Sequence, residues 1–437
     1  MVLLKNFVNI FKIAELRKKL FFTLGVLIVY RLGGHIPVVG IDINALSQFM
    51  AQQSTAGGFF AYLDLFSGGM LRTCTLFALG ISPYITASIM MQMLGMTIPS
   101  LEQLLKEGEY GKKIINQYTR YLALGVAVVQ GSLFAGYLEV QNLVLSPGWG
   151  FRLTFLLSIV VGSMFVMWLG EQISLFGIGN GSSMIIFAGI VANFPEYVIR
   201  VAGLLELGEM DVLMALAILG VFIVVSACIV YLEKGERKIP VQYSRRVVGN
   251  RVYGGQSTYI PFKINPAGVM PVIFAGAVLN MPMFLIQWLS QRFEFFQGIL
   301  EYVSGGALVY NVVQFLLIIF FSFFYTALVF NPEELSENIK KQGGFIPGIR
   351  PGRKTAEYFN YILTRVGLVG AIYLAILALL PNILKLFIEM PFFLSGTALL
   401  IVVGVALETA AQIESYLIEH RYEGLLTSGR FKSRGMR

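Results

Sequence analysis

Long apolar runs alternate with polar connections along the whole of this 437-residue chain. A helix that crosses a bilayer needs roughly 20 consecutive, mostly apolar residues. The runs that meet this requirement cover, by residue number, 20–36, 73–96, 119–138, 152–171, 183–203, 212–232, 267–289, 308–330, 362–381 and 393–417. The pattern therefore predicts an all-α polytopic membrane protein with ten transmembrane helices.

One further apolar run, at 58–71, is too short to cross a bilayer. It also contains a carboxylate, Asp64, and a flexible pair, Gly68 and Gly69. Backbone that enters the membrane without crossing it is tolerated only where protein covers it or where it lines a cavity. We therefore expect a short re-entrant helix at about 59–71 that is shielded from lipid.

Two short sequence patterns occur once in each half of the chain. The pattern G-[IV]-x-P-x-I-x-A is found at Gly80–Ala87 and again at Gly268–Ala275. A second pair, Gly181–Ile186 and Gly396–Ile401, begins with glycine and ends with isoleucine. The four segments lie in the second, seventh, fifth and tenth runs, which is the order that duplication of a five-helix unit produces.

An odd number of spans separates the two copies, so the copies should cross the membrane in opposite directions. We expect an N-terminal half at 1–205 and a C-terminal half at 206–437. Folds built from two inverted five-helix repeats place their working site near the middle of the membrane, where the halves meet.

Proline occupies a matched position in the repeated pattern, at Pro83 and Pro271. Because proline cannot donate a hydrogen bond to the carbonyl four residues earlier, each is expected to interrupt its helix in mid-span. One interpretation is a simple kink in each helix. The other is a pair of movable helices, which the matched positions favour.

Isoleucine also recurs at matched positions. Ile81 and Ile85 are four residues apart and so share one face of a helix. If the repeats meet at a common axis, the matched isoleucines converge there and form a constriction that excludes water and ions. The five residues are Ile81, Ile85, Ile186, Ile273 and Ile401. The alternative for each of them, taken singly, is an ordinary core or lipid-facing position.

The composition excludes a soluble enzyme. The chain is 56% hydrophobic and 13% charged, whereas a soluble domain is about a quarter charged. Cys74 and Cys228 stand inside apolar runs, without the spacing of a metal site or a disulfide framework. Most of the 33 Lys and Arg residues fall in the two terminal segments and in alternate connections. This distribution places both termini on the cytoplasmic side.

Two of the cytoplasmic connections, 233–265 and 331–361, are unusually long and basic. One interpretation is that they carry orientation signals on a solvated surface. The other is that they form a docking surface for a large acidic or RNA-containing partner. Their length favours docking, because orientation needs only a few charges in a short loop.

No catalytic or metal-binding constellation is evident in the sequence. Gly348–Thr355 differs from a phosphate-binding loop in its spacing, and Gly177–Gly181 is better explained as a tight turn. A membrane-embedded enzyme would need a catalytic pair, and a secondary transporter would need charged groups near the midplane. The sequence supplies neither convincingly, so we expect no enzymatic activity and no cofactor.

Six strings carry a resemblance to one family. They are Phe66–Gly69, Phe77–Ile85, Trp168–Ile173, Gly177–Gly181, Phe324–Pro332 and Gly348–Gly352. With them, the chain resembles the SecY family, the central channel subunits of the bacterial Sec protein translocase, over essentially its whole length.

The resemblance implies a channel that passes unfolded secretory polypeptides across the bacterial cytoplasmic membrane and releases membrane segments sideways through a lateral gate. The implied partners are the SecE and SecG subunits, the SecA motor ATPase, the ribosome, secretory and membrane preproteins, and membrane lipids. Since the sequence holds no ATP site, the energy would come from the motor or from the ribosome.

The resemblance also implies roles for particular residues. The five isoleucines would form the pore ring. The segment at about 59–71 would be a plug, represented by Phe60, Leu63, Asp64, Phe66, Gly68 and Gly69. The runs 73–96 and 267–289 would line the lateral gate, with Pro83, Thr86, Gln92, Pro271 and Asn280. Partner docking would fall to Arg245, Arg246, Arg251 and Arg350, while Asn250 stands where some relatives carry a basic residue.

Overall fold

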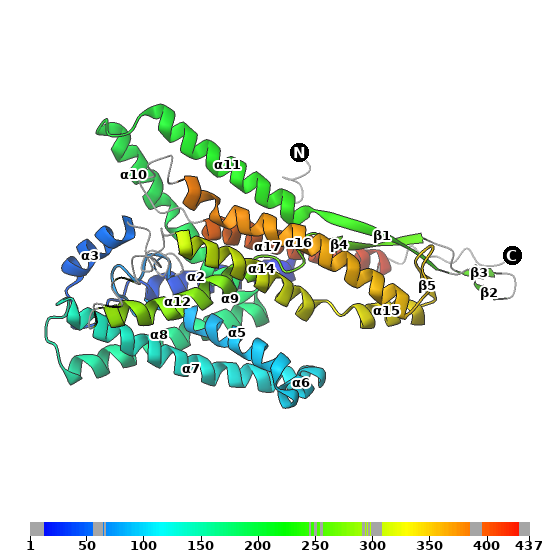
Figure 1. The fold of residues 1–437 in the computed structure, drawn as a ribbon, viewed down its shortest axis with the longest axis horizontal. Coiled ribbons are helices and arrows are strands. Elements are labelled where there is room, and N and C mark those ends of the chain that lie inside the picture. The colour runs from blue at the N-terminus through cyan, green and yellow to red at the C-terminus, as the bar shows by residue number, and fades with distance from the viewer. Residues whose placement is uncertain are drawn as a thin grey trace. The chain divides into compact units, whose positions relative to one another are not determined.

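The computed structural model describes residues 13–55, 64, 67–243, 246–248, 251–253, 257–290, 293, 295, 298, 308–384 and 396–427 (Figure 1). The chain divides into two compact units. Unit 1 contains Met1–Ile199 together with Val405–Arg437, and unit 2 contains Arg200–Gly404. The predicted division at 205/206 concerns the duplicated halves and stays a prediction.

Unit 1 is built from helices. Helix α5 packs on α7, α7 packs on α8, and α8 packs on α9, while α2 contacts both α8 and α9. The elements are α2 (Ala14–Gly33), α3 (Ile43–Thr55), α5 (Ser82–Thr97), α6 (Pro99–Lys106), α7 (Glu109–Val140), α8 (Trp149–Phe176), α9 (Gly181–Ala192) and α10 (Phe194–Glu206), which continues into unit 2.

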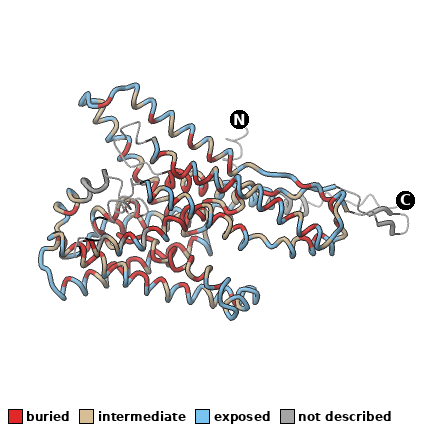
Figure 2. The backbone as a smooth tube through the Cα atoms, viewed as in Figure 1, coloured by how far each residue is buried: buried red, intermediate tan, exposed pale blue. Residues whose placement is uncertain are grey.

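Helix α8 shows why these helices belong in a bilayer. Its buried face includes Phe155 and Ile159, both with 0% exposure. On another face, Leu153, Leu157 and Val161 are four residues apart and 57–64% exposed. Figure 2 shows this alternation of buried and exposed residues along the helix. An outward apolar stripe is stable against lipid tails, whereas a helix that faces water carries polar residues there.

The tight turn predicted at Gly177–Gly181 is confirmed, and it is fixed to its surroundings in unit 1. Gly179 has a φ of +85°, and its amide donates to Gln412 Oε1 at 2.8 Å. The amide of Ile178 donates to Thr23 Oγ1 at 3.0 Å. Asn180 caps the N-terminus of α9 with its side chain.

Unit 2 combines apolar helices with a small β-structure. Helix α12 packs on α14, and α14 and α11 both pack on α16. The elements are α11 (Val212–Lys234), β1 (Glu236–Tyr243), β2 (Arg246–Val248), β3 (Arg251–Tyr253), β4 (Ser257–Lys263), α12 (Met270–Ser290), α14 (Leu308–Val329), α15 (Pro332–Lys341), β5 (Gly344–Phe345), α16 (Arg353–Leu384) and α17 (Gly396–Thr427), which continues into unit 1.

The predicted all-α class is confirmed, because most of the described residues are helical and a helix lies at each of the ten expected spans. Seven helices in the described part of the chain are long and apolar enough to cross a membrane by length and composition. Helices α2, α5 and α12 occupy the other three expected spans.

One of the predicted spans needs correction, and another contains a break. The run 73–96 is helical only from Ser82, and residues 68–81 form a series of turns. The run 183–203 lies within one candidate span, Gly181–Glu206, which is interrupted at residue 193, since α9 ends at Ala192 and α10 begins at Phe194. Asn193, between them, is 6% exposed, and the local signals of this break are Asn193 itself and Pro195.

Candidate functional site

The two copies of the repeated pattern start their helices in the same way. Gly80 and Gly268 both adopt the left-handed conformation, with φ values of +54° and +60°. Two residues later α5 begins at Ser82 and α12 begins at Met270. The prediction that Pro83 and Pro271 interrupt their helices in mid-span is therefore wrong.

Each proline is instead the second residue of its helix, where an N–H group would lack an intrahelical partner in any case. The pattern G-[IV]-x-P marks a helix start that is reached through a left-handed glycine. Each of α5 and α12 is consequently a separate element, which is not continuous with the chain that leads into it. Within α12, the interior proline is Pro282.

The second repeated pattern also marks helix starts. Gly181 is the first residue of α9, and Gly396 is the first residue of α17. A β-carbon on Gly181 would overlap the carbonyl oxygen of Gly170 on α8. A β-carbon on Gly396 would likewise overlap that of Ala378 on α16. Only glycine allows this close approach of two backbones.

A third matched contact lies eight residues earlier on the same two helices. A β-carbon on Gly162 of α8 would overlap the carbonyl oxygen of Leu76, and one on Gly370 of α16 would overlap that of Ile264. Leu76 and Ile264 each stand four residues before the left-handed glycine of their own unit. The two units therefore share one local architecture, which supports the duplication inferred from the sequence.

The five isoleucines occupy corresponding places at these helix starts. Ile85 and Ile273 are each the fourth residue of a helix, Ile186 and Ile401 are each the sixth, and Ile81 is the N-cap residue of α5. All five are at most 8% exposed. In unit 1, a β-carbon on Gly170 would lie 3.3 Å from Cδ1 of Ile81, so this side chain packs beside α8. The ring itself stays a prediction.

The end of the expected plug is held by charge. The carboxylate of Asp64, which is 4% exposed, accepts a hydrogen bond from Arg72 Nε at 2.5 Å. The backbone amide of Arg72 donates to the other carboxylate oxygen at 3.3 Å. Arg72 Nη1 also reaches Glu196 Oε1 on α10 at 3.2 Å. Arg72 thus ties the segment that contains Asp64 to a helix 124 residues further along the chain.

Unit 1 also encloses the glycine pair that follows. Arg31 Nη1 of α2 donates to the carbonyl oxygen of Gly68 at 2.9 Å. A β-carbon on Gly68 would lie 2.6 Å from the Cα of Gly189, and one on Gly69 would lie 3.0 Å from Asn193 Oδ1. Both glycines have positive φ. Phe60, Leu63 and Phe66, which were predicted to belong to the plug, lie outside the described residues.

The predicted gate residues lie on α5 and α12. Thr86 is buried, and its hydroxyl donates to the carbonyl oxygen of Ser82 at 3.1 Å. Gln92 Nε2 donates to Ser88 Oγ at 3.2 Å. The Oε1 atom of Gln92 is buried, with no hydrogen-bond partner in the described part of the chain. Asn280 lies within α12.

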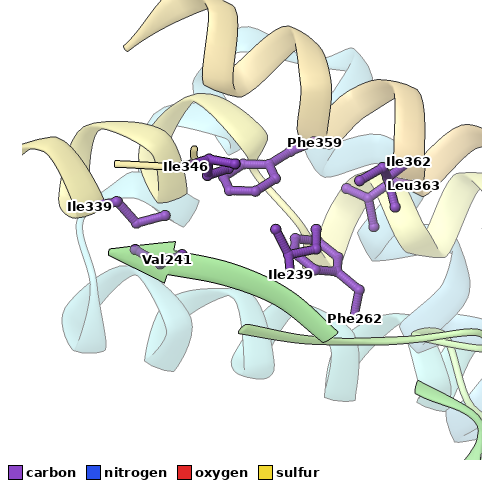
Figure 3. Packing of buried hydrophobic residues seen from close by; sticks show 8 residues of the cluster. All are labelled: Ile239, Val241, Phe262, Ile339, Ile346, Phe359, Ile362 and Leu363. Carbon is purple, nitrogen blue, oxygen red and sulfur yellow. The ribbon is translucent and has the colours of Figure 1, made fainter. Parts of the chain in front are cut away.

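The two basic connections fold together into a module with its own core. Strand β1 pairs antiparallel with β4, from Glu236 opposite Lys263 to Gln242 opposite Ser257, and β1 also pairs with β5. Figure 3 shows the side chains that pack between the strands, α15 and the first turns of α16. They are Ile239, Val241, Phe262, Ile339, Ile346, Phe359, Ile362 and Leu363.

This module positions Arg350 on a short exposed loop. Gly348 and Gly352, on either side of it, both have positive φ. The carbonyl oxygen of Gly352 accepts from Ser336 Oγ at 2.7 Å, and that of Arg350 accepts from Thr355 Oγ1 at 3.0 Å. The loop therefore has a defined backbone, while the Arg350 side chain is exposed.

The other predicted docking residues are placed only in part. Arg246 and Arg251 lie in β2 and β3, which pair antiparallel with Arg246 opposite Tyr253 and Val248 opposite Arg251. Arg245 lies outside the described residues. The core of the module was not among the predictions from the sequence. Its signal was the alternation of Ile239, Val241 and Tyr243, which is typical of a strand with one buried face.

Comparisons with known proteins agree on one family. The family model SecY matches residues 75–410. The chain is 46% identical to the protein translocase subunit SecY of Aquifex aeolicus over 421 residues, which covers 95% of this chain and 97% of that protein. It is 42% identical to the SecY subunit of Escherichia coli K12 over 429 residues, which covers 97% and 96%.

Solved structures show the same fold. A protein-conducting channel superposes with a TM-score of 0.68 at 20% identity, over 91% of this chain and 92% of that chain. Sec61 in a canine ribosome–channel complex superposes with a TM-score of 0.62 at 20% identity, over the same shares.

Proposed function

Since the chain belongs to the SecY family of protein translocase subunits, we propose that it forms a passive, gated channel for unfolded polypeptide in the bacterial cytoplasmic membrane, with both termini in the cytoplasm. The observation that carries this proposal is the repeated helix start. In each unit a left-handed glycine begins a separate helix, and a buried isoleucine lies in the first turn of that helix.

The pore ring is proposed from the corresponding positions of the isoleucines. Branched apolar side chains in a narrow pore repel water, so ions that would need to keep their hydration shell cannot pass. A threaded polypeptide could displace these flexible side chains, because no covalent bond or ion pair would have to break. The five residues are Ile81, Ile85, Ile186, Ile273 and Ile401.

The plug is proposed for the segment at about 59–71. What supports it is the set of contacts that fix its C-terminal end, from the Asp64–Arg72 ion pair to the carbonyl oxygen of Gly68 held by Arg31. Deleting the segment should raise the ion leak through the channel, and an unchanged leak would count against this role.

The lateral gate is proposed to lie between α5 and α12. Support comes from Gln92, whose buried amide oxygen lacks a hydrogen-bond donor in the described part of the chain. Such an unpaired oxygen is costly in a closed core, and a backbone N–H of an incoming chain would satisfy it. The gate would let signal sequences and membrane segments pass sideways into lipid. Pro83, Thr86, Pro271 and Asn280 are the other positions proposed for it.

Docking is proposed for the module formed by the two basic connections. Its core holds Arg350 outward on a defined loop, where an exposed guanidinium can bind carboxylates or phosphates in a bidentate manner. Among the similar structures, one is a Sec61 in a ribosome–channel complex. We propose that this chain likewise binds the ribosome, and that SecA, SecE and SecG are its other protein partners.

Transport by the reconstituted chain tests the proposal directly. The full-length chain with its partner subunits, placed in liposomes, should carry a secretory preprotein into a protease-protected lumen when SecA and ATP are supplied. A secondary transporter would instead take up a small solute along an ion gradient. Solute uptake without protection of the preprotein would refute the channel.

A further inference from the structure

The two gate helices share a feature that neither packing nor helix propensity requires. Each begins two residues after a glycine in the left-handed conformation, at Gly80 before α5 and at Gly268 before α12. Around Gly268 the space is open, because an added β-carbon would meet no atom within 4 Å. At this position the glycine is therefore needed for its backbone conformation and not for close packing.

The chain before each glycine is held against a long helix. The backbone at Leu76 is in such close contact with Gly162 of α8 that no side chain fits between them, and the same is true of Ile264 and Gly370 of α16. Both of these contacts lie four residues before the left-handed glycine. In unit 2, Asn265 also ties this segment to the end of α11, since its Nδ2 atom donates to Glu233 Oε1 at 2.8 Å.

Few backbone hydrogen bonds cross each glycine, although in unit 2 the carbonyl oxygen of Gly268 accepts from Asn265 Nδ2 at 2.9 Å. Proline at the second position of each helix has no N–H group, so Pro83 and Pro271 cannot donate back across the glycine. In unit 1 the amide of Ser82 does reach back to the carbonyl oxygen of Leu79, at a long 3.3 Å. The rest of each helix follows its own hydrogen-bond ladder.

We propose that Gly80 and Gly268 are a matched pair of hinges about which α5 and α12 swing when the channel opens. This inference rests on the proposed role of these helices as the lateral gate. Glycine is the one residue that passes between left-handed and right-handed backbone at little cost, so rotation at one residue can reorient a whole helix. The contacts at Gly162 and Gly370 keep the other side of each hinge in place.

The hinge predicts a specific effect of alanine at Gly268. An L-amino acid with a β-carbon disfavours the left-handed conformation relative to glycine by a factor of roughly 5 to 30. Gly268→Ala should therefore lower the population of the α12 orientation seen here, relative to displaced orientations, by that factor. Gly268→Asn should not, because asparagine tolerates the left-handed conformation far better than alanine does.

Spin-label distances within unit 2 measure this shift. One label replaces Val278 on α12, which is 37% exposed, and the other replaces Val369 on α16, which is 65% exposed. Val278 lies eight residues after the start of α12, about 12 Å along the helix axis, and before Pro282. A swing of about 20° moves such a point by roughly 4 Å. The full-length chain, with Cys74 and Cys228 replaced by alanine, is measured in lipid nanodiscs.

We expect Gly268→Ala to enlarge a second, displaced distance population by roughly 5- to 30-fold, with the distribution of Gly268→Asn matching that of the parent. The matched control is Gly220→Ala on α11, where an added β-carbon also meets nothing within 4 Å. Its distribution should match that of the parent. A folded Gly268→Ala protein with the parent distribution would overturn the hinge, as would an equal shift in the Gly220→Ala control.

If Gly268→Ala does not fold, Gly80→Ala in unit 1 gives the same test. The labels then replace Leu94 on α5 and Val161 on α8, both exposed, with Gly125→Ala as the control. The distances do not depend on transport. Failure of preprotein transport in the parent protein would refute the proposed channel, and unchanged distances in the alanine variants would refute only the hinges.

Discussion

The ion pair between Arg72 and Asp64 gives the sharpest prediction about the plug. Asp64 has a side chain that is only 5% exposed, while that of Arg72 is 27% exposed. Removal of one partner from a buried ion pair costs roughly 3 to 5 kcal/mol, because the other charge is left uncompensated. In Arg72→Ala the backbone amide at position 72 can still donate to Asp64, and the arginine site is partly solvated.

We therefore expect Arg72→Ala to weaken the closed position of the plug by about 2 kcal/mol, which corresponds to a roughly 30-fold higher population of the displaced plug. The assay is the ion conductance of the complete channel in planar bilayers without a translocating chain. Lys106→Ala is the matched control, because it removes an ion pair with Glu102 in the same unit in which the two side chains are 74% and 50% exposed. Such surface pairs contribute at most about 1 kcal/mol.

A double variant separates the charge from the packing. Asp64→Asn combined with Arg72→Ala leaves no uncompensated buried charge, because Glu196, the other partner of Arg72, is 52% exposed, so its conductance should return toward that of the parent. Parent-like conductance in Arg72→Ala would refute this account of the plug anchor. A leak in Lys106→Ala as large as that in Arg72→Ala would refute it as well.

Three further predictions concern other parts of the chain. Phe359→Ala empties a fully buried position in the docking module and should destabilise that module by roughly 3 to 5 kcal/mol; faster limited proteolysis of the module checks this. Arg350→Glu should impair SecA-driven transport at an unchanged rate of proteolysis, and normal transport would contradict its docking role. Gly181→Ala forces a methyl group against the Gly170 carbonyl and should lower the melting temperature of the purified chain, whereas Gly125→Ala in open space should not.

The membrane helices could be predicted from the sequence because lipid imposes one simple rule on them. About 20 apolar residues are needed to span a bilayer, and a run of that length is visible without any knowledge of packing. The prediction of a span at 73–96 was wrong at its beginning because hydropathy does not report backbone conformation. Residues 73–81 are as apolar as the helix that follows, yet Gly80 and Pro83 place the helix start at Ser82.

The docking module could not be predicted in the same way, because its many charged residues keep the local hydropathy low although some of its side chains are buried. Basic residues surround Ile239, Val241 and Phe262, so the two connections were interpreted as basic loops, for orientation or for docking, without a core of their own. Their alternation along the strands is a short-range signal, but pairing of β1 with β5 joins segments about 100 residues apart. The contact between Arg72 and Glu196 is also long-range, because the two residues are 124 positions apart. A single sequence does not show which distant charges form an ion pair.

Cysteine trapping of a stalled chain tests the proposed pore most directly. Each of the five isoleucines, Ile81, Ile85, Ile186, Ile273 and Ile401, is replaced singly by cysteine in a background without Cys74 and Cys228, and a secretory chain with one cysteine is stalled in the channel. The account predicts a disulfide with the stalled chain from all five positions and none from Leu157→Cys on the exposed face of α8. Disulfides from only one or two of the five positions, or from Leu157→Cys as readily as from Ile85→Cys, would contradict it.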